Sequence, residues 1–310
     1  TGSESNVKEI YDACNELEKD PGNFILNQFS EFSNHIGPHE GTSRALEHLY
    51  LNLAESHPGL NLSAFVAASG SAGTLAAGER LKSEYGARIV AVEALECPTM
   101  LYNGFGEHNI QGIGDKHIPL IHNVTNTDVV VGISDQACDE LGVVFNSPEG
   151  LAYLSELGIN PSIISQLGHF GLSGICNVLA AIKTAKKLGF GADDAIVTVA
   201  TDGAELYASE REAMAANRYV NGFSSEDASA AVEEHLRGVD TNDVEVLDEI
   251  GKNRIFNLGY YTWVEQQGIE FSDFEIRREQ DVWEHLQTLA PAWDELIEEF
   301  NNQTGVLAGR

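Results

Sequence analysis

The sequence predicts an α/β protein in which a parallel sheet is covered by helices on both faces, giving three layers. Three observations predict this fold. Residues 62–93 contain an apolar run, a small-residue loop, a helical pattern and a second apolar run, which is the order of a βαβ unit. Further apolar runs typical of buried strands follow at residues 128–131 and 195–200. Patterns of helical spacing separate these runs from one another.

Before this unit the chain alternates between short elements and polar connections. Apolar residues at helical spacing predict a helix over residues 6–19, which ends near Pro21 and Gly22. Residues 24–26 are a short strand candidate, and residues 33–42 are crowded with polar groups and indicate a loop. Thr42 or Ser43 is expected to cap a helix that continues through Ala54.

The βαβ unit predicts a strand over residues 65–68, a loop over 69–74, a helix to Tyr85 and a strand over 89–92. Gly70 and Gly73 allow a sharp turn, so several amide groups can converge on one point at a helix N-terminus. Such a point favours an anion, and a phosphate is the natural ligand. The alternative is a tight turn whose small residues serve packing alone, because two glycines at this spacing are a weak signal.

The remainder of the chain continues the α/β pattern and then changes character. Residues 97–127 show little regular pattern, and loops of that length are usually functional. A strand is expected at 128–131, helices at 135–141 and 148–157, and a long helix after residues 171–174. The strand at 195–200 ends at Thr201 and Asp202, where the carboxyl edge of a parallel sheet binds ligands. Residues 208–310 are acidic and are expected to form a helical extension that packs on the core or forms a dimer contact.

Composition restricts the class of protein. The chain has 310 residues, of which 43% are hydrophobic, and no apolar run is long enough for a membrane span. It opens on a polar stretch without the features of a signal peptide, so a soluble protein is expected. A net charge of −30 argues against nucleic acid and anionic membranes as partners. An acidic chain with few lysines also suggests a salt-adapted source, in which counterions screen the repulsion.

Cysteine and histidine spacing does not predict a metal site. The four cysteines are scattered without a Cys-x-x-Cys pair, which indicates reduced thiols in a cytoplasmic protein. Six of the histidines fit no compact ligand set and are expected to lie in loops or a cleft without metal. They are His35, His39, His108, His117, His122 and His169.

Several motifs together resemble one known family. The loop Gly70-Ser71-Ala72-Gly73-Thr74 is similar to a glycine-rich loop that holds a cofactor phosphate. Residues 108–114 with Ile118-Pro119, Gly171-Leu172-Ser173-Gly174, and Gln28-Phe29 with residues 39–42 are similar to further segments of the same family. In this order, over residues 6 to 207, they resemble the fold-type-II pyridoxal-phosphate enzymes, in particular the cysteine synthase and cystathionine β-synthase branch.

The resemblance implies a cofactor, a site and a domain organisation. The cofactor is pyridoxal 5'-phosphate, the substrate is an amino acid, and the protein is expected to be a cytoplasmic homodimer. Implied cofactor-binding residues are Gly70, Ser71, Ala72, Gly73, Thr74, Thr201 and Asp202. Implied residues of the substrate cleft are Gln28, Gln111, Gly112, Ile113, Gly114, Gly171 and Ser173. Residues 1–40 would be the remainder of a small N-terminal domain, 41–207 the cofactor-binding domain and 208–310 the helical extension.

The chain departs from the family pattern in two respects. Family members carry the Schiff-base lysine and the loop for the substrate carboxylate in an N-terminal segment, and neither motif is present here. The chain is expected to begin where the family's first domain is nearly complete. Of its eight lysines, seven lie in helical or polar contexts that indicate solvated surface, namely Lys8, Lys19, Lys82, Lys183, Lys186, Lys187 and Lys252. Lys116 alone follows a segment of the expected cleft.

The second departure concerns the cofactor ring. The family usually places a serine where it bonds the pyridine nitrogen, whereas this chain offers Thr201 or Asp202. A threonine would leave the nitrogen unprotonated, which suits β-elimination. An aspartate would protonate the nitrogen and make the ring a deeper electron sink. Thr201 is slightly preferred, and both stay open at this point.

The expected function is therefore β-replacement or β-elimination on an amino acid, by a chain that holds the cofactor phosphate but lacks the catalytic lysine. On its own, such a chain is expected to be inactive. One alternative is a non-catalytic binding or regulatory protein of the same fold. A second is a dinucleotide-binding oxidoreductase domain, in which Glu93 at the end of a strand would bind the ribose. The loop lacks the Gly-x-Gly-x-x-Gly pattern of that class.

Overall fold

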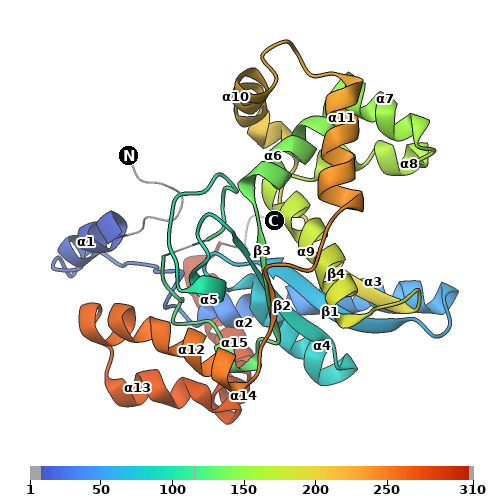
Figure 1. Ribbon diagram of the computed structural model, residues 1–310. Coiled ribbons are helices and arrows are strands. Elements are labelled where there is room, and N and C mark those ends of the chain that lie inside the picture. The colour runs from blue at the N-terminus through green and yellow to red at the C-terminus, as the bar shows by residue number, and fades with distance from the viewer. Residues whose placement is uncertain (1–7, 115, 307–310) are drawn as a thin grey trace.

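The computed structural model describes residues 8–114 and 116–306, and a five-stranded sheet of order β4-β1-β2-β3-β5 lies at its centre (Figure 1). The strands are β1 (Asn61–Ala68), β2 (Arg88–Ala94), β3 (Val129–Ile133), β4 (Asp194–Thr198) and β5 (Val244–Val246). The first four strands are parallel to one another, and β5 is antiparallel to β3. The sheet is therefore mixed at one edge rather than purely parallel.

Helices cover both faces of the sheet, as the sequence predicts (Figure 1). Alternate residues of β1 point to opposite faces. Phe65 and Ala67 pack with α3 and α4, whereas Ala64 and Val66 pack with α6, α9 and α11. The helices of the domain that carries the sheet are α2 (Ser33–Glu40), α3 (Thr42–Ser56), α4 (Ala77–Tyr85), α5 (Thr99–Tyr102), α6 (Asp135–Val144), α7 (Pro148–Glu156), α8 (Pro161–Ile164) and α9 (Leu172–Leu188).

The predicted strands and helices of the βαβ unit are confirmed. Because β1 and β2 are buried on both faces, their sequences are nearly continuous apolar runs instead of alternating ones. In the parallel register, Val66 lies opposite Val90 of β2 and Thr198 of β4. The carboxyl ends of β1, β2 and β4 consequently lie along the same edge of the sheet.

Three predictions before β1 are wrong. Neither Thr42 nor Ser43 caps α3, because its N-cap is Gly41, which makes no side-chain cap hydrogen bond. Residues 24–26 form no strand, and Phe24 and Leu26 are 82% and 77% exposed, because no neighbouring strand offers them hydrogen bonds. Residues 33–40, predicted to be a loop, form α2. Pro38 lies inside this helix and lacks an N–H, which is why the segment looks irregular in sequence. Burial of Ile36 and two histidines against the core stabilises the helix nevertheless.

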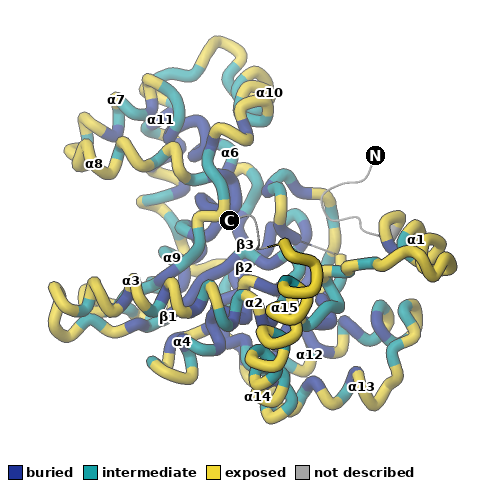
Figure 2. Tube along the Cα trace, turned by 180° about the vertical axis from the view of Figure 1, so that it is seen from behind, coloured by how far each residue is buried: buried dark blue, intermediate teal, exposed yellow. Residues whose placement is uncertain are grey.

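The C-terminal segment is mostly helical, as predicted, but it also contributes strand β5. Its helices are α10 (Ala208–Arg218), α11 (Ser225–Val232), α12 (Glu249–Tyr260), α13 (Phe271–Glu275), α14 (Gln280–Gln287) and α15 (Ala290–Thr304). Phe256, Trp263 and Phe274 are buried in the same core cluster as Phe65 of β1. The segment is thus part of the core, while α15 buries no residue and is exposed along its length (Figure 2).

Helix α1 (Lys8–Leu17) lies at the N-terminal end of the described residues and projects from the body of the protein (Figure 1). Most of its residues are exposed, but Tyr11 is buried. Among the helices that the structure describes, none has the length and apolar character that a membrane span requires.

Candidate functional site

The loop that follows β1 has several amide groups without acceptors. Among the described residues, no hydrogen-bond acceptor is found for the backbone N–H of Gly70, Ser71, Ala72 or Thr74. Ala72 adopts a left-handed backbone conformation with φ of 69°, which turns the chain within the loop. A short 3-10 segment, Thr74–Ala76, then leads directly into α4. Amides in this arrangement, at the start of a helix, are suited to hold an anion.

The glycines of this loop allow it to pack closely against two other segments. A Cβ atom at Gly73 would stand 2.6 Å from the main-chain and side-chain oxygens of Asn34, closer than real contacts allow. A Cβ atom at Gly70 would stand 3.2 Å from the carbonyl oxygen of Gly112. The loop is therefore held between α2 and the segment at residues 111–114, and a side chain at residue 73 would displace it.

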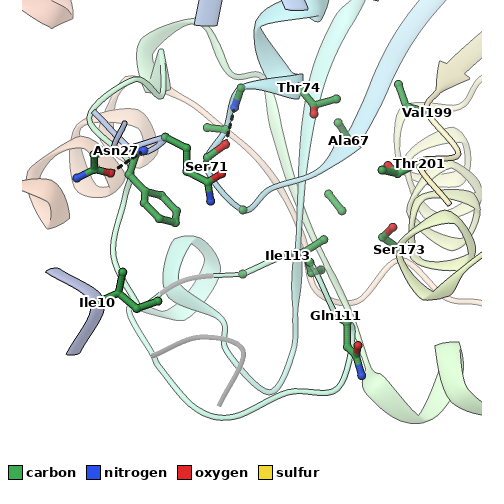
Figure 3. A pocket seen from close by; sticks show the side chains of 18 of the residues that line it. Ile10, Asn27, Ala67, Ser71, Thr74, Gln111, Ile113, Ser173, Val199 and Thr201 are labelled. Atoms are coloured by element: carbon green, nitrogen blue, oxygen red, sulfur yellow. Dashed lines mark hydrogen bonds between the residues drawn. The ribbon is translucent and has the colours of Figure 1, made fainter. Parts of the chain in front are cut away.

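A cavity of about 540 Å³ opens beside this loop, at the carboxyl ends of β1 and β4. Its volume lies in the range of small-molecule sites. Every predicted site residue except Gly171 lines this cavity. The lining includes Gln28, Gly70, Ser71, Ala72, Gly73, Thr74, Gln111, Gly112, Ile113, Gly114, Ser173, Thr201 and Asp202. Figure 3 shows Thr201 and Ser173 near each other, with Ser71 across the cavity from them.

Gly171 lies behind the cavity and positions the chain at Asp202. Its N–H donates to the main-chain carbonyl of Asp202 over 2.9 Å, and it is the N-cap of α9. A Cβ atom at Gly171 would collide with the carboxylate of Asp202. Oδ2 of that carboxylate accepts a hydrogen bond of 2.6 Å from the hydroxyl of Tyr207. Both residues line the cavity. The Asp202 carboxylate already accepts a bond through Oδ2, while its buried Oδ1 has no hydrogen-bond partner among the described residues, and the side chain of Thr201 is exposed.

The structure adds Asn177, which the sequence analysis missed. It lines the cavity and ties two strands together there: its Oδ1 accepts from Ala68 N over 2.7 Å, and its Nδ2 donates to Val199 O over 3.1 Å. These bonds fix the ends of β1 and β4 next to each other. The available signal was its spacing, since Asn177 stands one helical turn after Ser173 and so lies on the same face of α9.

Helix α1 forms another wall of the cavity that was not predicted, through Ile10, Tyr11 and Cys14. The ring of Tyr11 lies among those of Phe29, His117 and Trp263, at centroid distances of 6.1, 5.7 and 6.3 Å. Its hydroxyl is 3.1 Å from Nε2 of His117. Burial lowers the pKa of His117 to about 4, so this imidazole is neutral at pH 7. Trp263 of the C-terminal segment thus packs against Tyr11, which lines the cavity.

The described lining of the cavity contains no lysine. Lys116 is exposed and is not part of the lining. One prediction about the lysines is wrong: Lys183 is buried, with its Nζ 3.7 Å from Asp240, because α9 packs between the sheet and the segment that follows α11. Lys82 is only partly exposed and forms an ion pair of 2.9 Å with Asp128.

Glu93 is not available for a ribose. Both of its carboxylate oxygens accept hydrogen bonds of 2.8 Å from the amides of Met100 and Leu101 at the start of α5. It is buried, and burial raises its pKa to about 7. The residue on which a dinucleotide site would depend is therefore occupied by a structural contact. Within residues 8–114 and 116–306, no group of three or more histidine, cysteine or acidic side chains is arranged to hold a metal ion.

Known proteins with similar sequences are cysteine synthases. The chain is 32% identical over 212 residues to cysteine synthase B of Campylobacter jejuni, which covers 67% of this chain and 61% of that protein. It is 31% identical over 156 residues to a cysteine synthase of Helicobacter pylori, which covers 49% of this chain and 44% of the relative. The chain thus spans 61% and 44% of the length of these two relatives. No protein-family profile matches it.

Solved structures agree with the sequence relatives. A hydrogen sulfide-producing enzyme of Fusobacterium nucleatum superposes with a TM-score of 0.50 at 26% identity, over 66% of this chain and 55% of that one. A cysteine synthase of Entamoeba histolytica has the same fold, with a TM-score of 0.50 at 23% identity over 73% of this chain and 59% of that one.

The cofactor of these enzymes is pyridoxal 5'-phosphate, and the residues present here fit such a group. The loop of unbonded amides can hold the phosphate, and the cavity is large enough for the ring, with Thr201 and Ser173 on its far side. The chain belongs to the fold-type-II pyridoxal-phosphate enzymes, as a relative of the cysteine synthases.

Proposed function

We propose that this chain forms the phosphate-binding and ring-binding side of an enzyme that replaces or eliminates the β-substituent of an amino acid. One observation carries the proposal. The unbonded amides of the loop after β1 and the hydroxyl of Thr201 line one cavity of about 540 Å³ at the carboxyl edge of the sheet. Pyridoxal phosphate, when bound, supplies an electron sink for bonds at the α-carbon of an amino acid.

The loop residues would bind and orient the phosphate group. The amides of Gly70, Ser71, Ala72 and Thr74 would donate to its oxygens, and the N-terminus of α4 would add the positive end of its dipole. Gly73 packs against Asn34, and this contact supports the position of the loop. The residues therefore supply pre-organised donors, which lose little conformational entropy when the anion binds.

Thr201 is the residue that we assign to the ring nitrogen. Its hydroxyl can donate to an unprotonated nitrogen. The carboxylate of Asp202, in contrast, lies beside Gly171 and accepts a hydrogen bond from Tyr207. This assignment favours β-elimination chemistry over reactions that require a protonated ring.

The substrate side of the cavity is formed by Gln28, residues 111–114 and Ser173. Gln28, Gln111 and Ser173 supply polar groups that can orient an amino acid, and Ile113 with Ile10 supplies apolar surface that excludes water. The chain's described lining offers no lysine to accept the α-proton. We therefore propose that this chain alone binds the cofactor without turning over a substrate.

The same observation supports a second candidate function. A cavity with a complete anion loop and no basic side chain in its lining also suits a non-catalytic protein that binds a phosphorylated B6 vitamer or an amino acid. A homodimer and a cytoplasmic location, which the family resemblance implies, stay predictions. Sedimentation velocity would test the dimer.

Binding of a phosphorylated and an unphosphorylated vitamer tests the shared part of both functions. Pyridoxine 5'-phosphate and pyridoxine are suitable probes, because they lack the aldehyde that would react with surface lysines. Equilibrium dialysis of the chain is expected to show at least about tenfold tighter binding of the phosphate ester, since several charge-assisted hydrogen bonds depend on it. Equal affinity for the two probes would refute the phosphate assignment.

Turnover separates the enzyme from the binding protein. The chain is expected to give no pyruvate from O-acetylserine or cysteine in the presence of pyridoxal phosphate. Activity that appears when a separately produced segment carrying a Ser-x-Lys element is added would support the enzyme. Absence of activity with such a segment bound would support the binding protein.

A further inference from the structure

Helix α14, in the C-terminal segment, contacts the helix that begins at the candidate phosphate loop. Nε2 of Gln287 donates to Oε2 of Glu79 over 2.9 Å. Glu79 lies in the first turn of α4 and is 7% exposed. A buried carboxylate needs hydrogen-bond donors, because without them its charge is costly. Gln287 is thus one of the groups that keep α4 in place.

The same helix α14 also contacts α2, on the other side of the loop. The ring of Trp283 lies against the ring of His35, with centroids 4.8 Å apart and an interplanar angle of 40°. Both side chains are fully buried. Nε2 of His35 is 3.5 Å from Oε2 of Glu79. Trp283 and Gln287 therefore join α2 and α4 at a single buried cluster.

Asn34, the neighbour of His35, connects this cluster to the loop. Its Nδ2 donates over 2.9 Å to the hydroxyl oxygen of Ser71 and over 2.9 Å to the carbonyl oxygen of Gln28. The main-chain and side-chain oxygens of Asn34 occupy the space that a side chain at residue 73 would need. A shift of α2 would consequently move Ser71 and the candidate substrate residue Gln28 together.

We propose that α14 is a positioning element of the phosphate loop, with Gln287 and Asn34 as its positioning residues. The proposal rests on the proposed function, because it concerns the same loop. It assigns to the C-terminal segment a role beyond packing or dimer contact. Asn34 acts on the loop directly through Ser71, and Gln287 acts through Glu79 and α4.

The test compares the affinities of two probes in three variants of the full chain. Asn34→Leu nearly keeps the size of the side chain and removes the donor without adding a charge, and Gln287→Ala removes the contact with Glu79. Each is expected to weaken binding of pyridoxine 5'-phosphate about tenfold, the loss that corresponds to one hydrogen bond near a charged group. Binding of pyridoxine, which has no phosphate, is expected to change less than about twofold.

Gln280→Ala is the matched control for the second variant. Gln280 lies on the same helix and also uses its side-chain amide, but it bonds to Asn123 over 3.0 Å and Thr125 over 2.6 Å, not to α4. Its loss is expected to lower the melting temperature without changing the preference for the phosphate ester. Melting temperatures of all variants show whether each is folded under the conditions of dialysis.

The outcomes distinguish this proposal from the proposed function. If the unmodified chain shows no preference for the phosphate ester, the proposed function fails and this inference fails with it. If the unmodified chain shows the preference and both variants keep it, only the positioning role is refuted. An equal loss of affinity for both probes in a folded Asn34→Leu variant would also refute it, since a general structural defect does not select for the phosphate.

Discussion

The hydroxyl of Tyr207 lies 2.6 Å from Oδ2 of Asp202, and this contact fixes the carboxylate beside Gly171. Thr201 and Asp202 both line the cavity, but the side chain of Thr201 is exposed, whereas that of Asp202 is only partly exposed and already accepts the bond from Tyr207. The pair Thr201 and Asp202, which the sequence leaves as alternatives, is thus arranged asymmetrically. The arrangement supports Thr201 as the partner of the ring nitrogen.

Substitutions at these two residues are expected to have different effects. Thr201→Val removes the hydroxyl at nearly constant volume and should weaken pyridoxine 5'-phosphate binding about fivefold to tenfold. Asp202→Asn should change the affinity less than about twofold, because Tyr207 can still bond to the side chain. The absorbance of the bound ring reports the state of its nitrogen. A changed spectrum in Asp202→Asn, with an unchanged one in Thr201→Val, would reverse the assignment.

Gly73 is expected to tolerate no side chain. In Gly73→Ala the added Cβ would meet two oxygens of Asn34 at 2.6 Å, so the loop must move away from its present position. We expect at least about tenfold weaker binding of pyridoxine 5'-phosphate, and complete loss in Gly73→Asp, where a carboxylate would repel the phosphate. Gly37→Ala is the matched control, since nothing lies within 4 Å of its Cβ position. Tight binding by Gly73→Ala would contradict the loop geometry.

Buried Glu93 is expected to make stability depend on pH. Burial raises its pKa from the ordinary value of 4.5 to about 7 in the folded protein. Its contribution to stability is therefore fully present below pH 4.5 and is lost as the pH rises to about 7. The loss is on the order of 3 kcal/mol, from the size of the pKa difference.

Urea denaturation of Glu93→Gln at several pH values checks this contribution. The variant should gain free energy of unfolding relative to the unmodified chain as the pH rises from 5 to 8, by about 1–3 kcal/mol. Near pH 5 the variant should gain no free energy of unfolding, because its NH2 group replaces one of the two oxygens that accept hydrogen bonds from Met100 and Leu101. A difference that does not vary with pH would show that Glu93 is charged at neutral pH. His117, whose pKa burial lowers to about 4, acts in the opposite direction and is common to both proteins.

The net charge of −30 is expected to make the protein salt-dependent. At low ionic strength the carboxylates repel one another over a Debye length of about 10 Å, whereas 1 M salt reduces it to about 3 Å. The melting temperature should therefore rise by about 5 °C or more between 0.1 and 2 M KCl. Sucrose, which carries no charge, is the control for general effects of cosolutes. A flat response to KCl would argue against adaptation to salt.

The sequence alone determined the fold class and predicted most of the residues that the structure places around the cavity. Apolar runs at 65–68 and 89–92 with a helical pattern between them indicate a parallel unit, because strands that are buried on both faces have nearly continuous apolar sequences. The carboxyl ends of such strands share one edge, so the loop at 70–74 and residues 201–202 were expected to meet there. These are consequences of local pattern and of general topology.

Only the tertiary structure decided the parts that depend on contacts between distant segments. Helix α2 contains Pro38, and burial of His35 and Ile36 stabilises it against its local preference. Strand β5 exists because β3 offers it an edge, and Asn34 reaches Ser71 only because α2 packs beside the loop. No local pattern encodes these pairings, since each one depends on the free energy of burying two surfaces that lie far apart in the chain.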